Sequence, residues 1–172
     1  MRGGEFAECD SCHRFFGSSS GLPLLFWPNN WDGKSDATEA VTEFYEANPF
    51  PNYEDVDSAS RLREMAGRSV FAKLLDHQIP YGANVLEVGC GTGQLSNFLG
   101  MRHGRSVVGT DICLNSLTLA ENFRQLNDIT NTRFLQMNLF RPSLASEQFD
   151  VVLCIGVLEY AGDDPDAFLG HL

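Results

Sequence analysis

The stretch VLEVGCGTGQLS, from Val85 to Ser96, decides the fold. It opens with a short, mostly apolar run and continues with Gly89, Gly91 and Gly93 at alternate positions. Glycine adopts backbone conformations with positive φ and, because it has no Cβ, lets a ligand approach the chain closely. The stretch therefore predicts a buried strand, a glycine turn and the first residues of a helix. What that turn holds is the central question about function.

Strand and helix patterns alternate along the rest of the chain. Strands are predicted over residues 85–88, 107–110, 133–137 and 149–155, and helices over 93–101, 114–126 and 166–172. Strands and helices that alternate with short joins are typical of a parallel sheet covered on both faces. Right-handed crossovers make such a sheet doubly wound. We expect an α/β fold with a doubly wound, mostly parallel, Rossmann-like sheet.

Two helices are predicted before this sheet, over residues 35–47 and 58–76. The loop NPFPNY, Asn48–Tyr53, separates them. Its rings, Phe50 and Tyr53, allow two interpretations: they pin the loop to the core, or they form a lid or a substrate wall. One face of the second helix is expected to carry Leu62, Met65, Ser69, Val70, Lys73 and Leu74.

The N-terminal segment has a different composition. Residues 1–34 are rich in Gly, Ser, Pro and Asn and are expected to be irregular. Cys9 and Cys12 form a lone C-x-x-C, whereas a structural zinc site needs four ligands. Half of a zinc ribbon and a terminus with two thiols both stay open, so no metal site is assigned. We divide the remainder into a helical segment, 35–80, and a Rossmann-like domain, 81–172.

Charge and composition narrow the classes of partner. The 172 residues carry a net charge of −11, and an acidic surface repels phosphate backbones, which makes nucleic acid an unfavourable partner. No run approaches the roughly 18 apolar residues of a membrane span, and no secretory signal is visible. The five cysteines have no disulfide-framework spacing, so a reducing, cytoplasmic setting is expected. The oligomeric state stays open.

The glycine turn is a weak match to the known phosphate-binding turns. The dinucleotide fingerprint G-x-G-x-x-G requires a glycine where Gln94 stands, and the P-loop requires a lysine that is absent. Glu87, two residues before the first glycine, would also repel a phosphate. A carboxylate at this position suits a cationic ligand or a hydrogen-bonding role at the end of the strand.

A second acid stands at the end of the next predicted strand. Asp111 follows Gly93 by 18 residues, and a doubly wound sheet brings it close to the glycine turn. An acid in this position accepts hydrogen bonds from the hydroxyls of a ribose. The competing role is to cap the helix that begins near Asn115. Asn138 ends the third strand, where its amide could bond an adenine edge while Ile112 packs on the ring.

Four motifs in series resemble the class I S-adenosylmethionine-dependent methyltransferases. They are VLEVGCGTG, VVGTD, MNL and FDVVLCIGVLEY, in that order within residues 81–165. The first motif is specific, and the others gain weight from their order and spacing. The resemblance implies S-adenosylmethionine as the cofactor and methyl transfer to a small-molecule acceptor. Methyl transfer needs positioning and desolvation more than a catalytic triad, which fits the absence of one.

The resemblance also implies a role for each matched residue. The turn that wraps the amino-acid part of the cofactor is Glu87, Gly89, Cys90, Gly91 and Gly93. Asp111 would bind the ribose hydroxyls, Ile112 would border the adenine, and Asn138 would contact its amino group beside Leu139. The stretch from Cys154 to Tyr160 would face the methyl donor and the acceptor. Glu159 and Tyr160 are the candidates for a base, although a surface acid and a packed ring explain them equally well.

The sequence departs from the family in its extent. A complete domain continues beyond the fourth strand, whereas this sequence ends inside the following helix. We expect a C-terminally truncated domain whose fourth strand is an apolar edge and whose cofactor affinity is weak. Two alternatives stay open: an adenosyl-ligand-binding or scaffold protein without catalysis, and a nucleotide-dependent oxidoreductase, which Gln94 and Glu87 disfavour.

Overall fold

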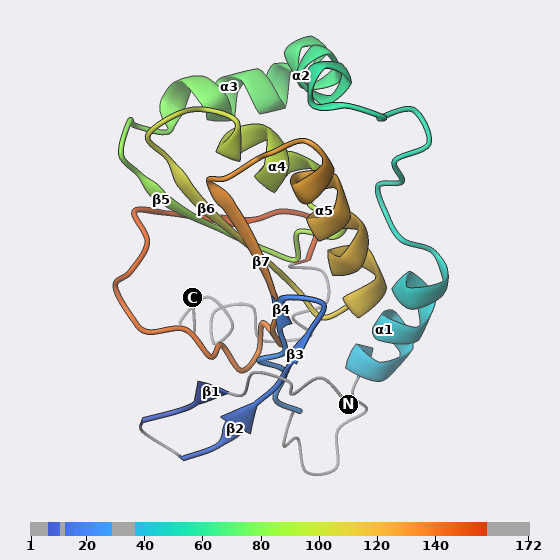
Figure 1. The fold of residues 1–172 in the computed structure, drawn as a ribbon, viewed down its shortest axis with the longest axis vertical. Helices are drawn as coiled ribbons and strands as arrows, with labels where there is room; N and C mark the ends of the chain where they lie inside the picture. The colour runs from blue at the N-terminus through green and yellow to red at the C-terminus, as the bar shows by residue number, and fades with distance from the viewer. Residues whose placement is uncertain (1–6, 11–12, 29–36, 158–172) are drawn as a thin grey trace.

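A four-stranded parallel sheet forms the centre of the computed structural model, which describes residues 7–10, 13–28 and 37–157 (Figure 1). The strand order is β7-β6-β5-β8. The strands are β5 (Asn84–Val88), β6 (Ser106–Asp111), β7 (Thr132–Gln136) and β8 (Val151–Cys154). The chain moves outward from β5 to β7 and then returns to the other side of β5 for β8. This order confirms the Rossmann-like sheet and places its switch point beside β5.

The core lies between this sheet and the helices on one of its faces. Val85, Val107 and Leu153 pack against Leu99 of α4 (Gln94–Gly100). Nearby, Phe134 packs against the buried residues of α5, which spans Leu114–Leu126. These helices therefore hold the carboxyl ends of the strands in a fixed arrangement. Within the described residues no helix is long and apolar enough to cross a membrane. The helix expected over residues 166–172 lies outside the described part of the chain.

The helix expected over residues 58–76 is two helices, and that prediction was wrong. Ser69 ends α2 (Ala59–Arg68), adopts extended backbone and accepts a hydrogen bond from the N–H of Ala72 as the cap of α3 (Val70–Gln78). The break changes the helical phase, so the expected apolar face is divided. Leu62 is buried, but Val70 and Leu74 are 78% and 55% exposed. Serine favours such caps because its hydroxyl competes with the helical hydrogen bonds.

The N-terminal segment is more ordered than its composition suggested. Two short antiparallel pairs form, β1 (Ala7–Glu8) with β2 (Phe15–Phe16) and β3 (Ser18–Ser19) with β4 (Leu22–Pro23). Leu24 then bridges Gln136 on β7, and the N–H of Leu25 donates to the Gln136 carbonyl at 2.8 Å. The segment after β4 therefore runs along the β7 edge of the sheet (Figure 1). Leu22 contributes to the core there.

Candidate functional site

All three glycines of the turn adopt left-handed backbone. Their φ angles are 68° at Gly89, 55° at Gly91 and 70° at Gly93, which an L side chain rarely adopts. Gly93 is also the N-cap of α4, and a Cβ there would lie 2.5 Å from Phe134 and 2.8 Å from Ala120. The third glycine therefore allows the helix to pack closely on the sheet and does not line a cavity.

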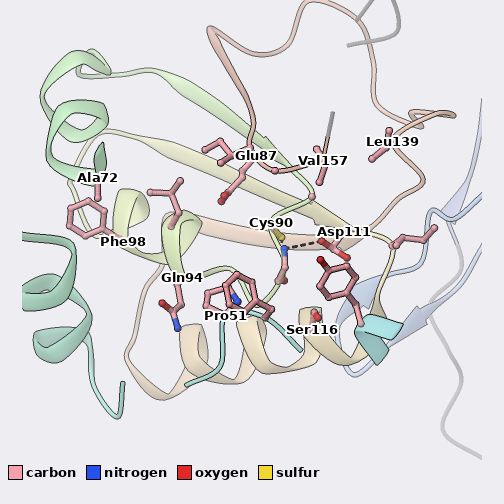
Figure 2. Close-up of a pocket in the computed structure, with 18 of the residues that line it drawn as sticks. Pro51, Ala72, Glu87, Cys90, Gln94, Phe98, Asp111, Ser116, Leu139 and Val157 are labelled. Carbon is pink, nitrogen blue, oxygen red and sulfur yellow. Dashed lines mark hydrogen bonds between the residues drawn. The ribbon is translucent and has the colours of Figure 1, made fainter. Parts of the chain in front are cut away.

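The carboxylate of Asp111 joins the glycine turn to the start of α5. Its Oδ2 accepts from the backbone N–H of Gly91 at 2.8 Å, and its Oδ1 accepts from the N–H of Cys113 at 2.9 Å. Figure 2 shows this carboxylate beside the turn. Burial raises the pKa of Asp111, although both of these hydrogen bonds oppose that shift. Asp111 therefore lines the cavity and orders the turn before α5, but it does not cap that helix as one interpretation expected, because it accepts from the N-cap residue Cys113 and not from the first helical N–H groups.

Glu87 is a buried acid, and no basic side chain among the described residues pairs with it. Glu87 lies on β5 and is only 5% exposed. Its Oε2 accepts a hydrogen bond from the hydroxyl of Ser96 on α4. Burial, and to a smaller extent the negative charge of Asp111, raise the pKa of Glu87 to about 7, although the hydrogen bonds from Ser96 oppose that shift. A cation brought into this site would favour the ionised carboxylate.

A cavity of about 650 Å³ opens in front of these groups. It extends from Leu139 and Asp111 past the glycine turn to Ala72 and Phe98 (Figure 2). The predicted cofactor residues all line it, except for two. Gly93 packs behind the turn, and Cys154 is a half-buried residue of β8 paired with Val88. The sheet therefore brings most of the predicted site together at the carboxyl ends of its strands.

Asn138 is positioned by two neighbours. Its Nδ2 donates to the carbonyl of Trp27 at 2.8 Å, and its Oδ1 accepts from the N–H of Phe140 at 3.0 Å. These two bonds fix which side of the amide carries the oxygen. The side chain lines the cavity from the end of β7, as the motif predicted, and the N-terminal segment supports it from behind.

The NPFPNY loop is anchored to the core and also lines the cavity, whereas its role as a lid or a substrate wall stays a prediction. Tyr53 stacks on Phe123 of α5 with ring centroids 4.6 Å apart, and its hydroxyl donates to the carbonyl of Thr92 at 2.9 Å. Gln94 donates its side-chain amide to the carbonyl of Asn52 at 2.7 Å. Phe50 meanwhile lines the cavity beside the glycine turn. One end of the loop is pinned to the core and the other lines the cavity.

Sequence reasoning missed the remaining walls. Val41 and Tyr45 reach the cavity from α1 (Ala37–Ala47), and Met65, Ala66 and Ala72 reach it from α2 and α3. Their helical stripes were visible in the sequence, but a stripe looks the same whether it faces a core or a cavity.

Several predicted residues fall outside the described part of the chain. Glu159 and Tyr160 are among them, as is Cys12 of the C-x-x-C pair. Cys9 lies in a turn, where its N–H donates to the carbonyl of Arg14 at 2.9 Å. No cluster of three or more metal-ligating side chains exists within the described residues.

The sequence of this chain matches the model of one known protein family. The model described as "Methyltransferase domain" matches residues 86–172, which is half of the chain. The chain belongs to the S-adenosylmethionine-dependent methyltransferases. The match covers the glycine turn, Asp111 and Asn138, so the motif resemblance is confirmed as a family relationship.

Individual methyltransferases share part of the sequence. A ubiquinone biosynthesis O-methyltransferase from Coxiella burnetii is 30% identical over 92 residues, or 53% of this chain and 38% of the relative. The chain spans only about a third of the length of the first curated relatives that it matches, 33% and 38%.

Solved structures share the fold of this methyltransferase chain. Magnesium protoporphyrin IX methyltransferase from Synechocystis PCC 6803 with bound SAM has a TM-score of 0.56 and 22% identity, covering 82% of this chain and 72% of that chain. The [4+2]-cyclase SpnF has a TM-score of 0.59 and 16% identity, covering 89% and 58%. Identities this low extend the likeness to the fold alone.

The residues of the cavity fit the family's cofactor. S-adenosylmethionine carries a ribose diol, an adenine ring and a sulfonium cation. Asp111 offers a carboxylate to a diol, and Ile112 and Leu139 offer apolar side chains to a ring. Glu87 and Asp111 are the acids of the lining, and the described lining contains no lysine, arginine or histidine. The donor set and its charge therefore suit a cationic nucleoside.

Proposed function

We propose that this chain binds S-adenosylmethionine in the cavity and directs its methyl group to a small, apolar, uncharged acceptor. The proposal rests on one observation: the side chains that line the cavity are polar at one end and apolar at the other. One end has the acids and the polar strand ends, and the other end has apolar side chains from four helices and a loop. A volume of about 650 Å³ is within the range of small-molecule sites and leaves room for two ligands side by side.

The cofactor end is assigned by the side chains at the strand ends. Asp111 holds a ribose at the end of β6, and Asn138 reads the adenine edge from the end of β7. Glu87 lies between them and the apolar end, where it favours positive charge. The left-handed turn at Gly89 and Gly91 presents backbone without side chains to the amino-acid part.

The acceptor end is assigned by what it lacks. Met65, Ala72 and Phe98 present no charge and few hydrogen-bonding groups. A carboxylate or phosphate on the acceptor would be buried there without a partner, which is unfavourable by several kcal/mol. The compared proteins are named for different reactions, so the acceptor class is inferred from this lining and not from their names.

When bound, the cofactor supplies an activated methyl group on sulfur. The chain's own contribution is then to orient two ligands and to exclude water. Tyr45 and Phe50 line the cavity from the side of α1 and the loop, where they limit the access of solvent to the reacting atoms once both ligands are bound. A base is needed only for an acceptor that loses a proton, and Glu159 and Tyr160 are the proposed candidates.

Cys90 and Cys113 are buried thiols, which fits the proposed cytoplasmic setting.

Calorimetry with three ligands tests the proposal. We expect heat of binding with S-adenosylmethionine and with S-adenosylhomocysteine, and none with NADH. Transfer of a labelled methyl group is then measured with uncharged aromatic acceptors and with their carboxylate analogues. Binding of NADH alone by the folded chain would overturn the cofactor assignment, and transfer confined to the carboxylate analogues would overturn the acceptor class.

The second candidate is an adenosyl-ligand-binding protein of the same fold without methyl transfer. The structural similarity to a protein named as a [4+2]-cyclase favours keeping it, because the fold alone does not prescribe the reaction. Binding of S-adenosylmethionine without transfer to any acceptor, in a chain that is folded, would favour this candidate.

A further inference from the structure

Helix α5 begins at the cavity without a capping side chain of its own. Its N-cap residue is Cys113, which makes no side-chain cap bond. The first backbone N–H groups of a helix have no partner inside the helix and usually bond to Ser, Thr, Asp or Asn at the N-cap. Another part of the chain must therefore supply the acceptors.

Glu46, at the end of α1, supplies them from 68 residues upstream. Its Oε1 accepts from the N–H of Leu114 at 2.7 Å, and its Oε2 accepts from the N–H of Asn115 at 3.1 Å. The side-chain amide of Asn115 donates back to the carbonyl of Glu46 at 2.8 Å. A carboxylate in this position also interacts favourably with the helix dipole. Figure 1 shows α1 lying beside the start of α5.

These bonds attach α1, which forms one wall of the cavity, to the start of α5. Val41 and Tyr45 line the cavity from α1, and Tyr45 is the residue before Glu46. Cys113 donates its N–H to Asp111, so the N–H groups of residues 113, 114 and 115 are shared between the Asp111 and Glu46 carboxylates. Loss of the Glu46 bonds would therefore free α1 and disturb the turn that carries Asp111.

We propose that Glu46 is a positioning residue, a latch that holds α1 over the cavity and so slows the escape of the bound nucleoside. The part of this proposal that concerns the nucleoside rests on the proposed function. The attachment of α1 does not, since it is a property of the unliganded chain. A capping role alone would stabilise α5 without controlling α1, and the two roles are separable by experiment.

Hydrogen exchange of the unliganded chain tests the latch directly. In Glu46→Ala we expect the amides of α1 to exchange about tenfold faster, because charge-assisted hydrogen bonds are lost, while those of α4 keep their rates. Glu43→Ala is the matched control, since Glu43 is an exposed acid three residues earlier on α1. Unchanged α1 exchange in Glu46→Ala would overturn the proposal.

A double variant separates the latch from a simple cap. Cys113→Ser places a capping hydroxyl at the N-cap of α5 in the Glu46→Ala background. We expect the thermal midpoint to recover while exchange in α1 stays fast. Recovery of slow α1 exchange in the double variant would show that Glu46 acts only as a cap, and the latch would be wrong.

The rate at which a bound ligand dissociates is the third measurement that tests the proposal. We expect S-adenosylhomocysteine to dissociate about tenfold faster from Glu46→Ala and from the double variant than from the parent chain and Glu43→Ala. Equal dissociation rates in a variant with fast α1 exchange would overturn the control of ligand escape. If the parent chain binds no S-adenosylhomocysteine, the proposed function and the ligand-escape part both fail, and hydrogen exchange still decides the attachment of α1.

Discussion

The N–H of Gly91 donates to the carboxylate of Asp111 across 2.8 Å, which joins the ends of β5 and β6 at the cavity. The second oxygen of the same carboxylate accepts from Cys113 at the start of α5. One acid thus orders both the glycine turn and the turn that begins α5. The site is organised before any ligand enters, which lowers the entropic cost of binding.

Asp111→Asn should damage both the turn and the binding of a nucleoside. An amide has a single oxygen, so its NH₂ group would face one of the two backbone N–H groups. We expect the affinity for S-adenosylhomocysteine to fall at least about 100-fold, because hydrogen bonds to a charged group are lost. Calorimetry measures this loss.

Asp150→Asn is the matched control for that variant. Asp150 accepts from the N–H of Asn84 at 2.8 Å, at the opposite end of β5 from the cavity. We expect this variant to keep its affinity for S-adenosylhomocysteine. Equal losses in both variants would mean that the effect of Asp111 is general stability and not ligand contact.

Gly93→Ala should destabilise the fold more than its backbone angle alone requires. The added Cβ would lie 2.5 Å from Phe134, in a core that cannot expand freely. Gly82 has a similar φ, 84°, but has open space around it, so Gly82→Ala measures the strain without the clash. We expect Gly93→Ala to lower the free energy of unfolding by about 2 kcal/mol more than Gly82→Ala. Denaturant titration gives both values, and equal losses would contradict the packing role.

The sequence contained enough to predict the sheet and the polar end of the cavity. Alternating apolar runs and a glycine turn define parallel strands, and polar residues at their carboxyl ends must meet at one edge. That reasoning placed Glu87, Asp111 and Asn138 on the cavity, as the structure has them. These are local signals, and each depends on only a few neighbouring residues.

Long-range contacts explain what could not be predicted. No sequence pattern indicates that Glu46 caps a helix 68 residues away, or that Leu24 pairs with β7. The break at Ser69 is local and was missed for a different reason. Serine is tolerated inside helices, so the residue type alone does not reveal the extended backbone and the bond to the N–H of Ala72 that begin a new helix.

Tyr53→Phe should loosen the loop that forms one wall of the cavity. Its hydroxyl donates to the carbonyl of Thr92 at 2.9 Å and accepts from the Asn97 amide at 3.4 Å. We expect a loss of about 1 kcal/mol in the free energy of unfolding, the usual net worth of a hydrogen bond. Tyr81→Phe is the control, because Tyr81 is 86% exposed. A denaturation series that ranks the two variants equally would contradict the anchoring role.

Glu87→Gln should change how stability depends on pH. The folded pKa of about 7 exceeds the ordinary 4.5, so the folded state binds this proton more tightly than the unfolded state does. The stabilising contribution is fully present below pH 4.5 and is lost as pH rises through 7. We expect the difference in unfolding free energy between parent and variant to change by about 3 kcal/mol across that window. A constant difference from pH 4 to pH 8.5 would show that Glu87 titrates normally.

The same acid should release a proton when a cationic ligand binds. Near pH 7 the carboxyl of Glu87 is partly protonated, and a sulfonium brought close to it favours the ionised form. We therefore expect S-adenosylmethionine to release up to about half a proton at pH 7, and the neutral S-adenosylhomocysteine to release less. Calorimetry in buffers with different heats of ionisation measures the number of protons. Glu87→Gln should abolish the difference between the ligands, whereas Glu64→Gln, which changes an acid ion-paired on the surface of α2, should keep it. Equal proton release by parent and Glu87→Gln would assign the proton to another group and remove Glu87 from the recognition of charge.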